Sequence, residues 1–123
     1  MEDKILKLNL EGYKVYLEIL RIFSNLKNPK IEPYSSLRNR ELEVLSVITY
    51  MHNEKYSKIP DKERNTLVFS YDSRQEVADT LGVSNEVVYN IMMDLRKKGF
   101  LEKNKVNKKL LIPPMKSLTL KFK

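Results

Sequence analysis

The chain has 123 residues, of which 41% are hydrophobic and 32% charged, and its formal net charge is +7. This length and mixture are typical of one compact folded domain with a single core. Disulfides and thiolate metal sites are excluded because the chain has no cysteine. No apolar run is long enough to span a bilayer and no signal-peptide pattern follows Met1, so we expect a cytoplasmic protein that does not contact a membrane.

The positive charge is concentrated near the C-terminus. Residues 96–123 carry ten Lys and Arg against one Glu, a net charge of +9. Residues 72–95 carry one Arg against five acidic residues, a net charge of −4. A folded body with one strongly basic end predicts a polyanionic partner that is contacted mainly from that end. The alternative is a lysine-rich surface that serves only solubility.

Residues 1–36 are predicted to form an N-terminal extension. Leucines alternate with polar residues over 5–10, which predicts a short strand. Apolar residues then recur every three or four positions, which predicts a helix over about 12–27 with a wide apolar face. Packing against the rest of the chain is the simplest explanation for this face, and a homodimer formed through it is the alternative. The Pro- and Ser-containing stretch over 28–36 predicts a linker.

Residues 37–71 are predicted to contain one helix and one strand. An apolar stripe at helical spacing predicts a helix over about 39–54, followed by a polar loop with charges of both signs. Alternation over 66–71 predicts a brief strand. The only histidine, His52, lies near the end of the predicted helix, where we expect it to cap the helix or to be solvated.

Residues 72–99 carry the densest local signals. Ser73-Arg74-Gln75-Glu76 has the sequence of a capping box, which predicts the start of a helix that ends at Gly82. Ser84 is suited to cap a second helix, which ends at Lys98-Gly99. Two helices joined by a three-residue turn that starts with glycine predict a helix-turn-helix.

A β-hairpin is predicted after Gly99. The two strands would cover 100–103 and 108–112, joined by the turn-like residues 104–107. A last strand is predicted over 118–122 from its alternating apolar residues.

This order of elements resembles the winged helix-turn-helix family of DNA-binding domains over residues 37–112. The run that carries the resemblance is Ala78-x-x-Leu81-Gly82-Val83-Ser84-x-x-x-Val88-x-x-x-Met92-x-x-Leu95-x-x-x-Gly99-Phe100-Leu101. Residues 37–45 are also similar to the opening helix of LuxR-type domains. They depart from it because Arg38 stands where a capping Thr is usual, and because extra residues with a strand precede the turn. MarR-like winged arrangements are closer.

The resemblance implies a mainly α fold with a small β-wing, to which an N-terminal strand and helix and a C-terminal strand are appended. Residues 1–36 would be the N-terminal extension, used for packing or dimerisation. Residues 37–114 would be the winged helix-turn-helix domain, and 115–123 a basic C-terminal strand or tail.

In this family the second helix of the motif enters the major groove and the wing contacts phosphates. Transferred position by position, the candidate base-reading residues are Ser84, Asn85, Glu86, Tyr89, Asn90 and Met93. The candidate phosphate contacts are Arg74, Arg96, Lys97, Lys98, Lys103, Lys105, Lys108 and Lys109. The first half of the second helix contains neither Arg nor Lys, so the commonest guanine contact is missing there.

Two functions follow from these observations. The first is a non-enzymatic protein that binds double-stranded DNA and regulates transcription or replication in a bacterium or, in the host cytoplasm, for a phage. The second keeps the fold but uses it as a protein-protein interaction or assembly module, such as a phage structural or accessory protein of the virion. The basic wing and tail favour the first function, and the acidic motif favours the second. We expect no catalysis, metal or cofactor, because the sequence has no paired-carboxylate site, no second His and no phosphate-binding Gly-rich loop.

Overall fold

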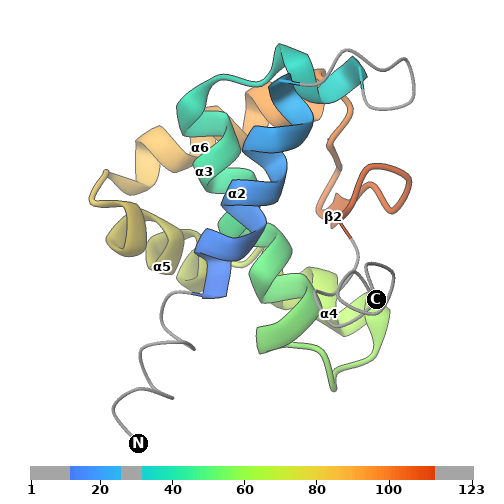
Figure 1. Cartoon of the computed structure of the whole chain (residues 1–123). Helices are drawn as coiled ribbons and strands as arrows, with labels where there is room; N and C mark the ends of the chain where they lie inside the picture. Colours follow the sequence, from blue (N-terminus) through green and yellow to red (C-terminus); the bar gives the residue numbers. More distant parts are fainter. Residues whose placement is uncertain (1–11, 26–31, 113–123) are drawn as a thin grey trace, which may run out of the picture.

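A computed structural model describes residues 12–25 and 32–112, and this part of the chain is mainly helical (Figure 1). In chain order the elements are α2 (Gly12–Asn25), the 3₁₀-helix η1 (Glu32–Ser36), α3 (Asn39–Tyr50), the π-helical turn η2 (Met51–Lys55), α4 (Asp61–Val68), α5 (Tyr71–Leu81), α6 (Asn85–Lys97), β1 (Leu101–Glu102) and β2 (Lys105–Val106). Within the described ranges, five α-helices and one antiparallel hairpin confirm the predicted mainly α fold with a small β-element. The strands predicted over 5–10 and 118–122 lie outside the described residues.

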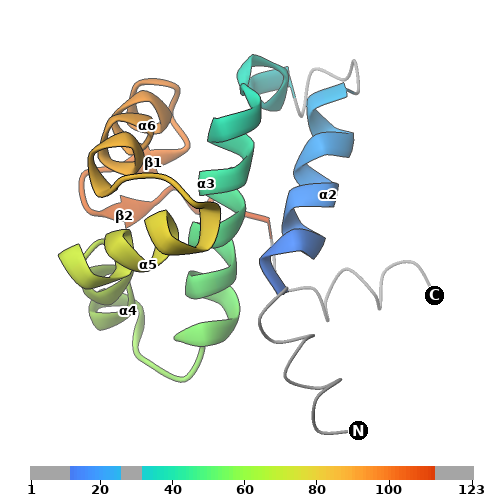
Figure 2. The ribbon, with the colours of Figure 1, turned by 90° about the vertical axis from the view of Figure 1, so that its left-hand side faces the viewer.

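Helix α3 runs through the middle of the molecule (Figure 2). Helix α2 packs along one side of it, while α5, α6 and the hairpin lie on the opposite side. As a result α3 buries apolar side chains all around its axis, including Leu42, Val44, Leu45, Val47 and Ile48. The core therefore consists of two interfaces that share α3.

Helix α2 confirms the first predicted helix. Its residues Tyr16, Leu17 and Leu20 are buried against the core, so packing within the chain accounts for the centre of the apolar face, whereas Val15 and Ile22 are exposed. A Cβ atom at position 12 would collide with the Tyr50 ring, which explains why glycine begins this helix. Homodimerisation through 12–27 stays a prediction.

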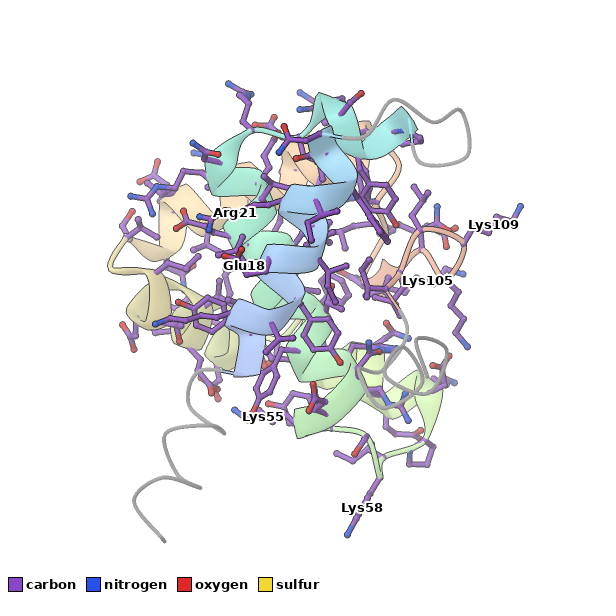
Figure 3. All side chains as sticks on the ribbon, in the orientation of Figure 1. Glu18, Arg21, Lys55, Lys58, Lys105 and Lys109 are labelled. Atoms are coloured by element: carbon purple, nitrogen blue, oxygen red, sulfur yellow. The ribbon has the colours of Figure 1, made fainter. Side chains whose placement is uncertain are left out.

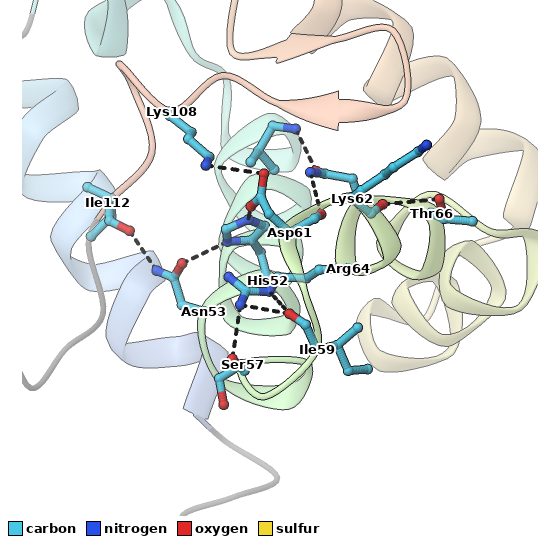
Figure 4. A network of polar contacts seen from close by, with 12 residues as sticks. His52, Asn53, Ser57, Ile59, Asp61, Lys62, Arg64, Thr66, Lys108 and Ile112 are labelled. Atoms are coloured by element: carbon cyan, nitrogen blue, oxygen red, sulfur yellow. Dashed lines mark hydrogen bonds and ion pairs between the residues drawn. The ribbon is translucent and has the colours of Figure 1, made fainter.

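The second predicted helix is confirmed as α3 continued by the π-helical turn η2. The expectation that His52 caps the helix or is solvated is wrong, because the residue is only 4% exposed. Its Nδ1 lies 3.0 Å from the side-chain oxygen of Asn53, and its Nε2 lies 3.7 Å from Asp61 (Figure 4). The Asn53 amide nitrogen donates to the Ile112 carbonyl at 2.6 Å, so its oxygen faces His52 and accepts from Nδ1. Polar neighbours that sequence spacing does not show therefore hold His52 inside.

The strand predicted over 66–71 is wrong, because these residues end α4 and begin α5. The alternating Leu67 and Tyr71 are exposed, so they do not mark a buried strand face. The inward positions are Asn65 and Val68, three residues apart as on a helix. Because Asn65 is polar, a search for apolar positions misses this face. Helix α4 also takes up part of the predicted polar loop.

Helix α5 begins about one turn earlier than predicted. Its N-cap is Ser70, whose hydroxyl accepts from the Ser73 backbone nitrogen at 3.2 Å. Ser73 is instead buried and donates to the Leu67 carbonyl at 2.6 Å, so the predicted capping box with Glu76 does not form. Both serines have the chemistry of a cap and both hydroxyls donate to the Leu67 carbonyl, so the point at which α5 begins after α4 decides which serine is the N-cap.

The hairpin is confirmed, but it is shorter than predicted. Leu101 pairs with Val106, and Glu102 with Lys105, so the turn is 103–104 and not 104–107. Asn104 has a φ of 57°, a left-handed conformation that asparagine adopts more readily than most residues. The chain therefore reverses within two residues, and 108–112 lies beyond the hairpin, where 108–110 form a turn and no part forms the predicted second strand.

The segment after the hairpin is held by buried polar groups. The Tyr34 hydroxyl donates to the Leu110 carbonyl, and burial raises the pKa of this tyrosine to about 12, so it remains a donor at neutral pH. The Tyr34 ring also meets Phe23 and Phe100 edge to face at 5.4 and 5.2 Å. Together with the Asn53 bond to Ile112, these contacts fix where the chain leaves the hairpin.

We predict that Asn65→Ala lowers the free energy of unfolding by about 1–3 kcal/mol, because it leaves a buried backbone N–H without a partner. The Asn65 oxygen accepts from the Val106 backbone nitrogen at 3.1 Å, and both residues are buried. Chemical denaturation monitored by circular dichroism measures the change. Thr66→Ala is the matched control, because Thr66 is exposed and bonds only within α4. Equal effects of the two substitutions would contradict this role of Asn65.

Candidate nucleic-acid interface

Helices α5 and α6 are joined by the three residues 82–84, as the sequence predicts. Gly82 ends α5 with a φ of 70°, which glycine adopts without steric penalty. The Ser84 hydroxyl accepts from the Val87 backbone nitrogen at 3.2 Å and so caps α6. Ala78 on α5 and Val88 on α6 are fully buried, which allows the two helices to approach closely.

The first half of α6 presents most of the predicted base-reading residues on its surface. Ser84, Glu86 and Asn90 are exposed, and Tyr89 is 48% exposed. Met93 is half-buried, and its sulfur lies 3.5 Å from a guanidinium nitrogen of Arg96. This surface therefore offers hydroxyl, amide, carboxylate and aromatic groups.

Arg74 lies at the junction of α5 and α6 and contacts both helices. Its guanidinium carbon is 5.3 Å from the ring centroid of Tyr71 and 5.2 Å from that of Tyr89. Its Nε donates to the side-chain oxygen of Asn85 at 2.6 Å. The guanidinium is thus held by two aromatic rings and one hydrogen bond. We call Tyr71, Arg74 and Tyr89 the tyrosine clasp.

Asn85 is the member of the base-reading set whose amide is already engaged. Its oxygen accepts from Arg74, and its nitrogen donates to the Gln75 side-chain oxygen at 3.1 Å. Gln75 in turn donates to Asp79 at 2.9 Å. Each amide in this chain donates at one end and accepts at the other, so the arrangement is directional and ends on a carboxylate. Asn85 must give up both bonds before it can pair with adenine.

A shallow hollow of about 60 Å³ continues from the tyrosine clasp toward the hairpin. Tyr89, Met93 and Arg96 line its α6 side, and Asn104 in the hairpin turn lines the other. The hollow therefore connects the candidate base-reading surface of α6 to the hairpin.

Ion pairs divide the predicted phosphate contacts into two groups. Lys108 lies 3.1 Å from Asp61, and this hydrogen bond lowers the pKa of the Asp61 carboxyl. Lys105 is 3.8 Å from Glu102, a long contact between exposed side chains. Within the described residues, Lys97, Lys103 and Lys109 have no ion pair, and all three are exposed. Lys105 and Lys109 lie on the hairpin side of the molecule, and Lys109 projects away from the body (Figure 3).

Lys98 is bound by other groups of the protein. Its ammonium is 2.6 Å from the Glu41 carboxylate and 2.6 Å from the Ser36 carbonyl. Glu41 is 2% exposed and also accepts from the Arg38 backbone nitrogen at 2.8 Å. Burial alone raises the pKa of Glu41, but the hydrogen bonds and charges of Lys98 and Arg38 together lower it below 4.5. Lys98 therefore joins the end of α6 to the start of α3.

Sequence reasoning missed Tyr71 and Gln75 as members of this surface. The spacing of Tyr71 and Arg74 on one helix would have revealed their contact, since residues three apart share a helix face. The approach of Tyr89 and Asn85 from α6 leaves no local signal, because it depends on how the two helices pack.

No group of His, Cys, Asp and Glu residues suited to hold a metal ion occurs in the described ranges. Among the helices of the same ranges, none has the length and hydropathy needed to cross a bilayer. Comparisons with protein-family models, with curated proteins and with solved structures find no significant match.

We predict that Lys98→Ala lowers the free energy of unfolding by about 3 kcal/mol, because it leaves the buried Glu41 carboxylate without its counter-charge. This value is at the low end for buried pairs because the lysine is partly exposed. Lys97→Ala, the matched control on the neighbouring exposed residue, should change stability by less than about 0.5 kcal/mol. Similar effects of both substitutions would show that the pair with Glu41 does not stabilise the fold.

The same pair predicts a pH dependence. Because the pKa of Glu41 is lower in the folded protein than its ordinary value of 4.5, its contribution is present above pH 4.5. The contribution is lost as the pH falls through the folded pKa. Thermal melts between pH 6 and pH 3 should therefore show a smaller decrease for Glu41→Gln than for the unmodified protein. A parallel decrease in both proteins would contradict the ion pair.

Proposed function

We propose that this chain is a winged helix-turn-helix protein that binds double-stranded DNA without catalysis and regulates transcription or replication. In this proposal α5, the turn 82–84 and α6 are the helix-turn-helix, and the hairpin is the wing. The observation that carries it is the exposed, polar first half of α6 beside a hairpin whose Lys103 is exposed and has no ion pair among the described residues.

The shape of this surface supports the proposal. The major groove of DNA is wide enough to admit one α-helix, and α6, which packs against α3, α5 and β1, keeps an exposed side. Asn90 can pair with adenine, Glu86 can accept from cytosine, and Tyr89 can contact a thymine methyl or a phosphate. All three side chains are exposed.

In this complex the residues that contact bases and the residues that attract phosphates must be different. The helix-turn-helix region is acidic, so attraction to phosphates must come from beside it. The residues placed to provide this attraction are Lys97, Lys103, Lys105 and Lys109. They lie at the end of α6, in the hairpin and just after it, so the positive charge forms one flank of the proposed interface.

A second candidate function, a winged-helix protein-protein module, is favoured by a specific observation on α6. Val87 is 41% exposed and lies one turn before Asn90, which gives the exposed side of α6 an apolar component beside the acidic Glu86. An acidic and partly apolar helix face is suited to a protein partner. The two candidates differ in whether duplex DNA binds at low salt.

We predict that binding to duplex DNA weakens steeply with salt. If four lysines neutralise phosphates, the logarithm of the association constant falls against log salt with a slope of roughly −3.6. Fluorescence anisotropy with random and genomic duplexes at several salt concentrations measures this slope. Absence of binding at low salt, or binding that does not respond to salt, would refute the proposed function and leave the protein-binding module.

Single lysine substitutions locate the phosphate contacts. Lys103→Ala, Lys105→Ala and Lys109→Ala should each reduce the salt slope by about 1 and weaken all sequences alike. Lys108→Ala removes the same charge but serves as the control, because that ammonium is paired with Asp61. An equal effect of all four substitutions would mean that net charge, and not a defined wing contact, drives the binding.

A further inference from the structure

We propose that Arg74, held in the tyrosine clasp, reads a guanine in the major groove and is the main determinant of sequence preference. This inference rests on the proposed function and adds to it the residue and the base. Helix α6 itself has no Arg or Lys between Asn85 and Asp94, so it offers no cationic donor for guanine there. The guanidinium that the recognition surface lacks comes from α5.

The position of Arg74 supports this assignment. Its guanidinium stacks on Tyr89 and donates to Asn85, and both of these residues belong to the first half of α6. The first half of α6 is the part expected to lie nearest to base edges. A side chain that contacts α6 at both points lies on the same surface as the predicted base-reading residues, although it starts on another helix.

The chemistry of the bound guanidinium also supports it. Nε is engaged by Asn85, and no hydrogen bond or ion pair of Nη1 and Nη2 occurs among the described residues. Those two nitrogens form a planar pair of donors, which matches the N7 and O6 acceptors of guanine. Tyr71 is 64% exposed and Tyr89 48%, so the open side of the clasp faces outward.

The restraint on Arg74 favours a base over a phosphate. A phosphate accepts from many directions, so a lysine can neutralise it as a point charge without a fixed orientation. A base edge accepts only in its own plane, so a donor pair fixed beforehand by two rings and one hydrogen bond gains selectivity. Asn85 then acts as a positioning residue, since its oxygen holds Nε and its nitrogen is held by Gln75.

The test begins with the full chain and a random duplex library. Repeated selection should enrich sequences that share a G·C pair at a fixed position. Replacing that guanine with 7-deazaguanine, which lacks the N7 acceptor but keeps O6, should weaken binding about tenfold, the low end of the range expected for a bidentate contact. This probe requires no change in the protein, so it remains decisive if a variant fails to fold.

Two substitutions then assign the contact to Arg74. Arg74→Ala should bind the G·C and A·T versions of the selected site equally. Arg74→Lys should keep non-specific binding at low salt but lose the guanine preference, because lysine has neither the planar fork nor the Nε donor. Arg40→Lys on α3 is the matched control: this exposed arginine pairs with Glu43, and the guanine preference should survive its substitution. Melting temperatures confirm that the variants are folded.

The outcomes separate this inference from the proposed function. If the unmodified protein does not bind duplex DNA, both fail. If it binds but selection gives no shared guanine, or if 7-deazaguanine has no effect, only the guanine contact is refuted. If Arg74→Ala weakens every sequence alike and reduces the salt slope, Arg74 contacts a phosphate and the inference is overturned while DNA binding stands.

Discussion

The burial of α3 between two layers is the constraint on which the rest of the structure depends. Polar groups on a helix that is covered on both sides cannot reach water, so each needs a partner inside the protein. Ser46 and Thr49 donate to carbonyls of the preceding turn. Glu41 is charged and requires a cation, which Lys98 supplies from the end of α6. The central helix thereby fixes α6, and with it the surface that α6 presents.

A consequence of this constraint is that the basic residues of the C-terminal region are not equivalent. Lys98 is engaged by Glu41 inside the fold, and Lys108 is paired with Asp61 on α4. Such pairs remove positive charge from the field that a nucleic acid would meet. The hairpin itself is positioned by a neutral contact, the Asn65 bond to Val106. Structural and unpaired cations are therefore neighbours in sequence but have different surroundings.

Local chemistry explains which features the sequence predicts. Gly82 and Ser84 mark the turn because left-handed backbone and helix capping are properties of single residues. The strand prediction over 66–71 is wrong because the inward face of this segment includes the polar Asn65. Asn65 is buried where it accepts from Val106, a residue 41 positions away. The contacts of Arg74 escape prediction for the same reason, because Tyr89 and Asn85 reach it only when α5 and α6 pack. Contacts between elements decide both cases.

The tyrosine clasp bears on the choice between a DNA partner and a protein partner. A guanidinium held by Tyr71, Tyr89 and Asn85 has lost much of its rotamer freedom before any ligand binds. That loss is useful when the partner offers acceptors in one fixed plane, as a base edge does. It is of less use against a phosphate, whose oxygens accept from many directions and which lysine point charges also neutralise. In the proposed complex the acidic character of residues 72–95 is compatible with DNA binding, because one directed cation would supply specificity while the unpaired lysines beside it would supply affinity.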